Sequence, residues 1–479
     1  MKFLLKTSLV GLAITGLMAC HSEDKKNTPS TGLVKDSVTT FEKVEKGNIL
    51  VWKATNDTTI SYAIYIPAVY DGVNALPAIA FFDPHGNGSL PLSNYKLLAE
   101  KYGFIFIGSN NAKNGNSPEQ NIGYAEALLK DVETKVKIAK GRFYAAGFSG
   151  GARVAAGWAI QNTHIAAVIG MGAGFPNTDK PIEHPFPYIG IAGNQDFNLT
   201  ELEELDHQLS QSRIIHQLLT FNGKHEWCPT AVFDKAITWI NFKAMGQHLI
   251  AKDSLAIQAY IAKTDSTIDS QESKKLYYEA LTGKREKLEF LYGLQSTQEA
   301  TALENQIKTL KQNPVVQKAI ERKKEIRTDE KQLREALLNA LATKDEKWWK
   351  PEVVKMNDPS KFQADQFLMN QRILNFLSLA CYMNINQMLA NRQVPEAAHF
   401  VELYAIIDPT NAEAPYIKAK IANSGGDNKT CIAQIKKAVE MGFNEPDRFA
   451  KEFKKILPEQ DFNTLYAAMV NNNSLNKKK

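Results

Sequence analysis

Cysteine is scarce in this sequence, which has four cysteines among 479 residues. Cys20 closes an apolar run near the N-terminus, and the others are Cys228, Cys381 and Cys431. Three thiols cannot form a disulfide framework, and no CxxC pair or Cys/His cluster indicates a zinc site. We therefore expect neither a disulfide framework nor a bound metal.

An excess of charge of one sign is also missing. The formal net charge is +5, and no basic helix or aromatic-basic stripe stands out, so we expect no nucleic-acid partner. The three terminal lysines, 477–479, are typical of a solvated tail. Hydrophobic residues at 44% and charged residues at 23% indicate ordinary globular protein, and this length predicts two or three domains.

The N-terminal segment has the pattern of an export signal. Lys2 and Lys6 precede an apolar run over residues 8–19, which is too short to span a bilayer as a permanent helix. This run ends in "LMAC", which resembles a bacterial lipobox. We predict a signal peptide over 1–19, lipidation of Cys20 and a polar tether over 20–40. These predictions imply a lipid anchor in the bacterial cell envelope, with the outer membrane as the expected location; ordinary cleavage with a retained thiol is the alternative.

Residues 41–248 alternate between strand-like and helix-like patterns. Short apolar runs at 76–83, 103–110 and 142–148 are typical of strands buried on both faces. Helical spacing separates such runs, for example at 125–139 and 231–245. Strands that alternate with helices of this length predict an α/β domain, with a mostly parallel sheet covered by helices on both faces.

Glycine and strand signals nearly vanish after about residue 246. We expect a helical region over 249–360, in which residues 250–345 predict two or three long amphipathic helices with breaks near 264–270 and at Pro314. Over 361–470, the expected helix ends at Asp408 and Gly442 are separated by one tetratricopeptide period. We therefore predict an all-α, tetratricopeptide-like region there, followed by a polar tail over 471–479. Such repeats often bind protein partners.

A glycine-rich stretch carries the strongest chemical signal. The letters "GFSGG" at 147–151 have the pattern G-x-S-x-G between a buried strand and a helix. A strand that turns at once into a helix leaves no room for side chains at Gly147 and Gly151. The serine at the apex, Ser149, is then exposed beside a helix N-terminus, where developing negative charge is favoured. We predict that Ser149 is a nucleophile.

A serine nucleophile needs a base and an orienting carboxylate. Asp196 and His225 each follow a predicted strand, at the sheet edge where α/β proteins place their sites. The order Ser, Asp, His is that of α/β hydrolases. The alternatives are less well placed, because they lie within predicted helices or strands, in a proline-rich loop, ahead of the strand that leads to Asp196, too soon after the serine or next to the base itself. They are His164, His184, His207, His216, Asp179, Asp206 and Glu226.

The turn after the strand at 76–83 predicts an oxyanion hole. His85 and Gly86 form an HG turn there, so the N–H of Asn87 is one expected donor and that of Gly150 the other.

Together, "FFDPHGNG", "GFSGGARVA", "AGNQDFN" and "GKHEW" resemble esterases of the α/β-hydrolase superfamily, of the dienelactone-hydrolase-like and polyhydroxyalkanoate-depolymerase-like kinds. The resemblance covers about 45–245 and implies ester hydrolysis without a metal or organic cofactor. The expected substrate is an ester-containing small molecule or carbohydrate. Two alternatives stay open: an envelope scaffold whose helical repeats bind a protein partner, and a serine peptidase. We also expect the helical half to form a separate module that supplies no catalytic group.

Overall fold

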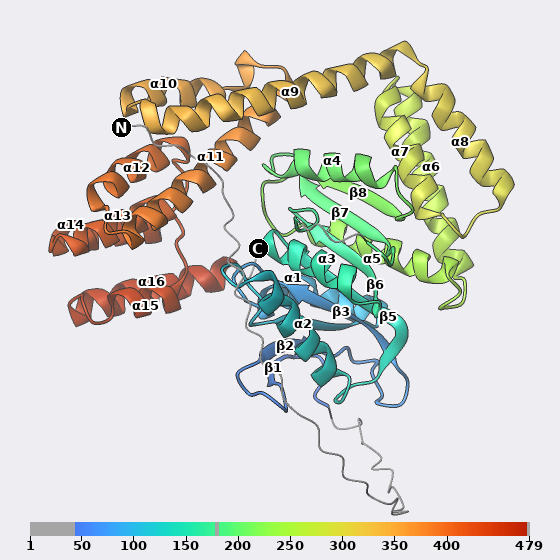
Figure 1. The fold of residues 1–479 in the computed structure, drawn as a ribbon, viewed down its shortest axis with the longest axis horizontal. Coiled ribbons are helices and arrows are strands. Elements are labelled where there is room, and N and C mark those ends of the chain that lie inside the picture. Colours follow the sequence, from blue (N-terminus) through green and yellow to red (C-terminus); the bar gives the residue numbers. More distant parts are fainter. Residues whose placement is uncertain (1–43, 178–181, 477–479) are drawn as a thin grey trace, which may run out of the picture. The chain divides into compact units, whose positions relative to one another are not determined.

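The computed structural model describes residues 44–177 and 182–476. The predicted signal peptide, Cys20 and tether lie outside these ranges, as does Asp179. All described residues belong to one compact unit, in which a sheet with its covering helices is followed by helices alone (Figure 1). The predicted fold class, a mostly parallel sheet with helices on both faces followed by an all-α region, is confirmed.

The sheet has eight strands in the order β1-β2-β4-β3-β5-β6-β7-β8. The strands β1 and β2 are antiparallel to their neighbours, and every pair from β4 to β8 is parallel. The strand bounds are β1 Ile49–Lys53, β2 Ser61–Tyr65, β3 Leu76–Phe82, β4 Ile105–Ser109, β5 Ile138–Phe148, β6 Ile165–Met171, β7 Tyr188–Gly193 and β8 His216–Phe221. The parallel strands bring their carboxyl ends to one edge, where the predicted site residues follow β3, β5, β7 and β8.

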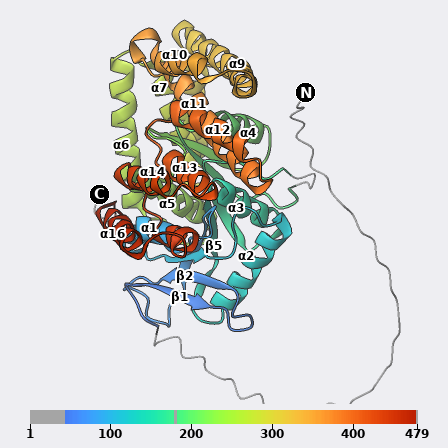
Figure 2. The same cartoon turned by 90° about the vertical axis from the view of Figure 1, so that its left-hand side faces the viewer.

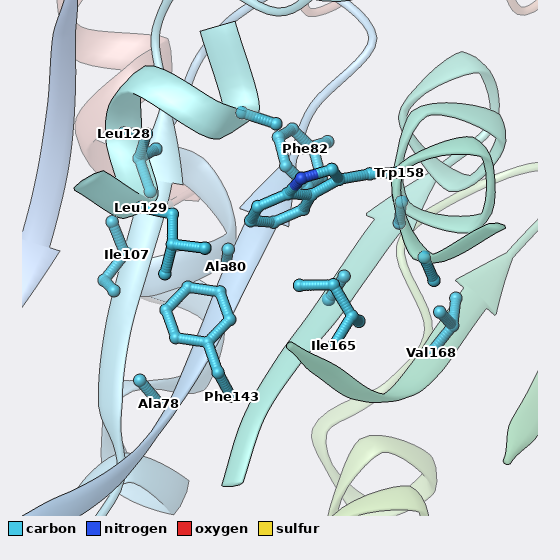
Figure 3. Packing of buried hydrophobic residues seen from close by; sticks show 14 of the residues in the cluster. Ala78, Ala80, Phe82, Ile107, Leu128, Leu129, Phe143, Trp158, Ile165 and Val168 are labelled. Carbon is cyan, nitrogen blue, oxygen red and sulfur yellow. The ribbon is translucent and has the colours of Figure 1, made fainter. Parts of the chain in front are cut away.

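Helices cover both faces of the sheet. Their bounds are α1 Ser89–Tyr102, α2 Pro118–Val132, α3 Gly150–Gln161, α4 Leu199–Leu209 and α5 Thr230–Gly246. One apolar core joins the sheet to α2, α3 and α4, and the other joins it to α1 and α5. In the first core, the ring of Trp158 packs edge-on against Phe82 and Phe143 (Figure 3). This packing fixes α3 directly behind β3 and β5.

The helix predicted at 125–139 lies earlier in the chain than expected. Ser117 caps α2 through a reciprocal pair of hydrogen bonds with Gln120, and Pro118 occupies the first turn, so the helix begins there. It ends at Val132, and Ile138 already pairs with Leu76 as part of β5. The apolar spacing that suggested a longer helix therefore spans a helix end, a turn and a strand start.

Four helices, rather than two or three, follow the sheet part: α6 Ser254–Ser273, α7 Tyr277–Phe290, α8 Thr297–Lys311 and α9 Pro314–Thr343. The break expected near 264–270 is wrong, because α6 continues through it. Pro314 does mark a boundary, since it stands at the first position of α9, where a missing N–H costs nothing.

The remaining helices are α10 Glu346–Met356, α11 Ala364–Ala390, α12 Val394–Ile407, α13 Glu413–Ser424, α14 Asn428–Glu440, α15 Pro446–Phe453 and α16 Glu459–Asn476. Successive helices from α11 to α14 pack side by side (Figure 2). The starts of α12 and α14 are again separated by one tetratricopeptide period. Their assignment as tetratricopeptide repeats stays a prediction. Among the described residues, no helix is both long enough and apolar enough to cross a membrane.

Candidate active site

Ser149 lies at the apex of a sharp turn between β5 and α3. Its backbone has φ 53° and ψ −120°, which a non-glycine residue rarely adopts. The N–H of Ser149 donates to Met171 O at 2.8 Å and anchors the strained residue to the neighbouring strand β6. The chain accepts this strain because the turn is fixed on both sides by buried elements.

Glycine is required on both sides of the serine because the backbone passes close to other backbone. A Cβ on Gly147 would collide with the carbonyl of Gly151, and one on Gly151 would collide with the carbonyl of Phe82. These are the contacts expected of G-x-S-x-G at a strand-to-helix turn. The structure therefore gives the two glycines the spatial role that the sequence pattern suggested.

Three predicted residues meet in one hydrogen-bonded chain. His225 Nε2 lies 2.9 Å from Ser149 Oγ, and His225 Nδ1 lies 2.9 Å from Asp196 Oδ1. The side chain of Asp196 is 1% exposed and that of His225 is 17% exposed. Asp196 Oδ1 also accepts the N–H of Asn198 at 2.8 Å, which holds the carboxylate in place. The structure thus brings together the serine, the imidazole and the carboxylate that the sequence suggested.

Aromatic rings fix the plane of His225. The ring centroid of Phe197 lies 4.2 Å from that of His225, and the centroid of Phe148 lies 4.7 Å from it. Gly172, with φ 65°, leaves room on another side, since a Cβ there would lie 3.0 Å from His225 Cε1. Packing of this kind limits the imidazole to orientations that keep both of its hydrogen bonds.

The turn after β3 differs from the predicted oxyanion hole. The N–H groups of His85 and Asn87 donate to Asp83 Oδ1 at 2.8 and 3.2 Å. Trp227 Nε1 lies 3.3 Å from the other oxygen of this buried carboxylate. The N–H of Asn87 therefore already donates to Asp83, a residue that the sequence pattern did not indicate. This geometry does not match the expected role of Asn87 as an oxyanion donor.

Gly150 fits its predicted role better. It is the first residue of α3, so its N–H has no partner within the helix. The side chain of Asn114 lies against it, because a Cβ on Gly150 would collide with Asn114 Oδ1. The N–H of Asn114 donates to Pro84 O at 2.9 Å, which attaches Asn114 to the turn after β3.

The loop that carries Asp196 is held by the helical part of the chain. Arg372 Nη1 donates to Asn194 O at 3.0 Å, and Asn375 Nδ2 donates to Gln195 O at 3.0 Å, both from α11. From α9, Arg334 Nη2 donates to the carbonyl of Phe197 at 2.8 Å. Three carbonyls on either side of Asp196 therefore depend on side chains that are distant along the chain.

A buried carboxylate orients the two arginines. Glu330, 1% exposed, accepts from Arg372 Nε at 3.0 Å and from its Nη2 at 2.6 Å. Arg334 Nη2 adds a contact of 3.3 Å to the same carboxylate. The expected separate module is therefore wrong in one respect: the helices supply none of the three central residues, but they brace the loop of one of them.

Sequence reasoning missed these bracing residues for a physical reason. Glu330 and Arg334 stand four residues apart in a helix rich in lysine and glutamate, where such side chains ordinarily lie in solvent. Nothing in that pattern distinguishes a buried pair from an exposed one. Two of the alternative histidines have other surroundings: His164 is exposed, and His216 Nδ1 lies 3.0 Å from Ile214 O, just before its strand. Among the described residues, no group of three or more His, Cys, Asp or Glu side chains could hold a metal ion.

No protein-family model matches the chain, and no curated protein matches it. Solved structures that it resembles include the S-formylglutathione hydrolase FrmB from Staphylococcus aureus, with a TM-score of 0.35, 14% identity and coverage of 40% of this chain and 95% of that chain. A feruloyl esterase module from Clostridium thermocellum has a TM-score of 0.34, 12% identity and coverage of 40% and 84%. An esterase from Pyrobaculum calidifontis has a TM-score of 0.34, 14% identity and coverage of 43% and 88%.

Proposed function

We propose that this protein is a serine hydrolase that cleaves carboxylic esters through an acyl-enzyme. The observation that carries the proposal is the hydrogen-bonded chain from Ser149 through His225 to Asp196, with 2.9 Å at each link. A nucleophile, a base and an orienting carboxylate in this order are what acyl transfer requires. The strained turn at Ser149 adds support, because such strain is rarely kept without a function.

Acylation begins when Ser149 Oγ attacks the ester carbonyl carbon and its proton passes to His225 Nε2. The tetrahedral intermediate collapses as the C–O bond to the alcohol breaks, and His225 returns the proton to the leaving oxygen. Water then attacks the acyl carbonyl carbon and gives a proton to His225, which passes it to Ser149 Oγ as the bond between Oγ and the acyl carbon breaks and the acid is released. Asp196 keeps the proton on His225 Nδ1 and stabilises the imidazolium.

The oxyanion of each intermediate needs two donors. We assign one to the N–H of Gly150, which has no partner within α3, and the other to Nδ2 of Asn114, whose amide group borders Gly150 with Oδ1 nearer to it than Nδ2. Losing one such donor costs about 10²–10³ in kcat. Asn114→Leu should therefore lower kcat by about that factor. Near-wild-type kcat in folded Asn114→Leu would remove Asn114 from the oxyanion hole.

Hydrolysis of 4-nitrophenyl acetate by the purified full-length protein tests the function. We expect a burst of nitrophenol and, after rapid acid quenching, a mass increase of one acetyl group on the peptide that contains Ser149. The matched 4-nitroanilide distinguishes the peptidase alternative, because a peptidase would cleave the anilide at a comparable rate. A folded protein that neither acylates nor turns over the ester would favour the scaffold alternative.

We also propose that the protein is anchored in the cell envelope by a lipid on Cys20. The support is the sequence alone, an apolar run that ends in "LMAC" before a polar tether. The test compares Triton X-114 partitioning of wild type with Cys20→Ser after expression with its leader. Wild type should enter the detergent phase and the variant should not. Equal partitioning of the two would overturn the anchor.

A further inference from the structure

A cavity of about 640 Å³ opens beside His225. From the sheet part it is lined by His225, Phe197, His85 and Lys224, and its other walls belong to helices α11, α12, α13 and α15 and to the turns beside them. This volume lies within the range of about 300–1,000 Å³ that is usual for small-molecule sites. The helical part therefore forms most of the wall of a cavity that the proposed catalytic base also lines.

The position of the cavity indicates which portion of an ester it would receive. In acyl transfer the base returns its proton to the leaving oxygen, so the alcohol portion lies on the histidine side of the nucleophile. His225 lines the cavity, and its Nε2 is 2.9 Å from Ser149 Oγ. An alcohol attached at the reacting carbon thus extends from His225 toward the helices.

One stripe of α11 faces this cavity, and it is mostly polar. Asn375, Leu379, Tyr382 and Asn386 line it at spacings of four, three and four residues, which places them on one side of the helix. Ordinarily a helix packed in a bundle presents apolar residues at such positions. Amide and hydroxyl groups there both donate and accept hydrogen bonds, as the hydroxyl groups of a ligand do.

The charged side chains on the helical wall of the cavity largely satisfy one another. Arg448 Nη2 lies 2.5 Å from Glu413 Oε1 and its Nη1 lies 3.4 Å from Glu445 Oε2. Lys420 Nζ lies 2.9 Å from Glu452 Oε1. Asp408 accepts hydrogen bonds from side chains of its own neighbourhood, among them Ser378 Oγ at 2.8 Å. A charged ligand would have to compete with these internal pairs, whereas a neutral ligand would leave them intact.

We infer that this cavity binds the alcohol portion of the substrate, and that this portion is neutral and carries several hydroxyl groups, as a sugar does. The inference rests on the proposed function and adds a specificity role for the polar stripe of α11. Phe197, buried against His225, adds an apolar contact at the His225 end of the cavity.

The test uses acetate esters that share the acyl group and differ in the alcohol: monoacetylated maltose, hexyl acetate, acetylcholine and 3-acetoxypropionate, with 4-nitrophenyl acetate as reference. We expect wild type to have the highest kcat/KM, relative to the reference, on acetylated maltose. Tyr382→Phe and Asn386→Leu should each lower that ratio by about tenfold, chiefly by raising KM. Met383→Leu is the matched control, because Met383 lies on α11 but is 62% exposed.

A preference for hexyl acetate or for either charged ester would overturn the inference while leaving the hydrolase proposal in place. So would an unchanged ratio in both Tyr382→Phe and Asn386→Leu. Absence of hydrolysis of 4-nitrophenyl acetate by folded wild type would overturn the hydrolase proposal itself, and the inference with it.

Discussion

The sheet part, residues 44–246, and the helical part, residues 254–476, approach the proposed site by different means. The sheet part brings backbone against backbone, as at Gly147 and Gly151, where any side chain would collide. The helical part reaches the site through long or polar side chains, such as Arg372 and Asn375. Only five of the 28 glycines follow residue 248, in keeping with this difference.

The difference follows from where each kind of element leaves its backbone groups. A strand end leads into a turn whose N–H groups and side chains are available for chemistry, so the sheet edge carries Ser149, His225 and Asp196, the residues of the proposed site. A helix satisfies its own N–H and C=O groups along its length and offers only side chains to a neighbour. The comparison predicts that reaction steps depend on the sheet part, and that precision and specificity depend on the helices.

The largest effect is expected from substitutions that remove Ser149 Oγ, the proposed nucleophile, or the proposed base His225 from the sheet edge. Ser149→Ala should lower kcat for 4-nitrophenyl acetate by about 10⁶-fold, and His225→Ala should have a similar effect, because the groups act as a unit. Circular dichroism and thermal unfolding should remain close to wild type. The control is His164→Ala, an exposed histidine of the sheet part. Near-wild-type turnover in His225→Ala would show that the base lies elsewhere.

The next largest effect is expected when a contact between the sheet part and the helical part is broken. Arg372→Ala leaves Glu330 buried without its main partner, which should reduce the free energy of unfolding by about 3–5 kcal/mol. It also removes the donor to Asn194 O, so kcat should fall by about 10- to 100-fold as Asp196 loses its alignment. Urea unfolding and steady-state kinetics measure the two effects.

A double variant separates bracing from stability. Arg372→Met with Glu330→Leu replaces the buried ion pair by apolar side chains, which should recover much of the lost stability. If Arg372, together with Arg334, which Glu330 also orients, positions the loop, kcat stays low in the double variant while KM for 4-nitrophenyl acetate is unchanged. Recovery of kcat together with stability would reduce Arg372 to a structural role. Arg327→Ala, which removes an exposed pair with Glu203, serves as the control and should cost less than about 1 kcal/mol.

A substitution at Gly151 tests whether the close backbone contacts of the sheet part exclude a side chain. Gly151→Ala should destabilise the protein by about 3 kcal/mol and abolish activity, because the new Cβ meets the fixed carbonyl of Phe82. Gly123→Ala in α2 is the matched control, since nothing lies within 4 Å of a Cβ there. It should raise stability by up to about 1 kcal/mol through helix propensity. Equal effects of the two substitutions in thermal unfolding would contradict the packing argument.

The smallest expected effect concerns a carboxylate in the sheet part. Burial raises the pKa of Asp131, but hydrogen bonds from Lys135, Tyr62 and Thr55 outweigh it, and the net pKa lies below the usual value of 3.8. A lowered folded-state pKa gives stability that is present above pH 3.8 and disappears as the pH falls through the folded value. Asp131→Asn should therefore cost about 1–2 kcal/mol at pH 7 and progressively less below pH 4.

The helical counterpart is the exposed pair of Lys350 and Glu346, 3.3 Å apart. Glu346→Gln should change the free energy of unfolding by less than about 0.5 kcal/mol at either pH. Urea titrations of both variants at pH 7 and pH 3.5 make the comparison. If the free energies of unfolding of wild type and Asp131→Asn differed as much at pH 3.5 as at pH 7, the assigned link between the lowered pKa of Asp131 and stability would be contradicted.

Much of the sheet part was predictable from local pattern. The alternation of strands and helices, the turn at Ser149 and the positions of Asp196 and His225 all follow from the periodicity, the glycines and the order of residues along the chain. Parallel strands send their carboxyl ends to one edge, so residues after different strands meet there without further information. The errors arose where a pattern crossed a boundary, as at 125–139, and where a backbone donor found an unexpected acceptor, as Asn87 did with Asp83.

By itself, then, the sequence determined the fold class, the strained serine and its two partners, because each depends on residues near one another or on the edge rule of a parallel sheet. Only the tertiary structure decided that Glu330, Arg334, Arg372 and Asn375 brace the loop of Asp196, and that α11 turns a polar stripe toward His225. Those contacts join segments that are far apart along the chain, from β7 to α9 and α11. A charged residue on a helix has the same local pattern whether solvent or another part of the chain covers it, and only packing distinguishes the two.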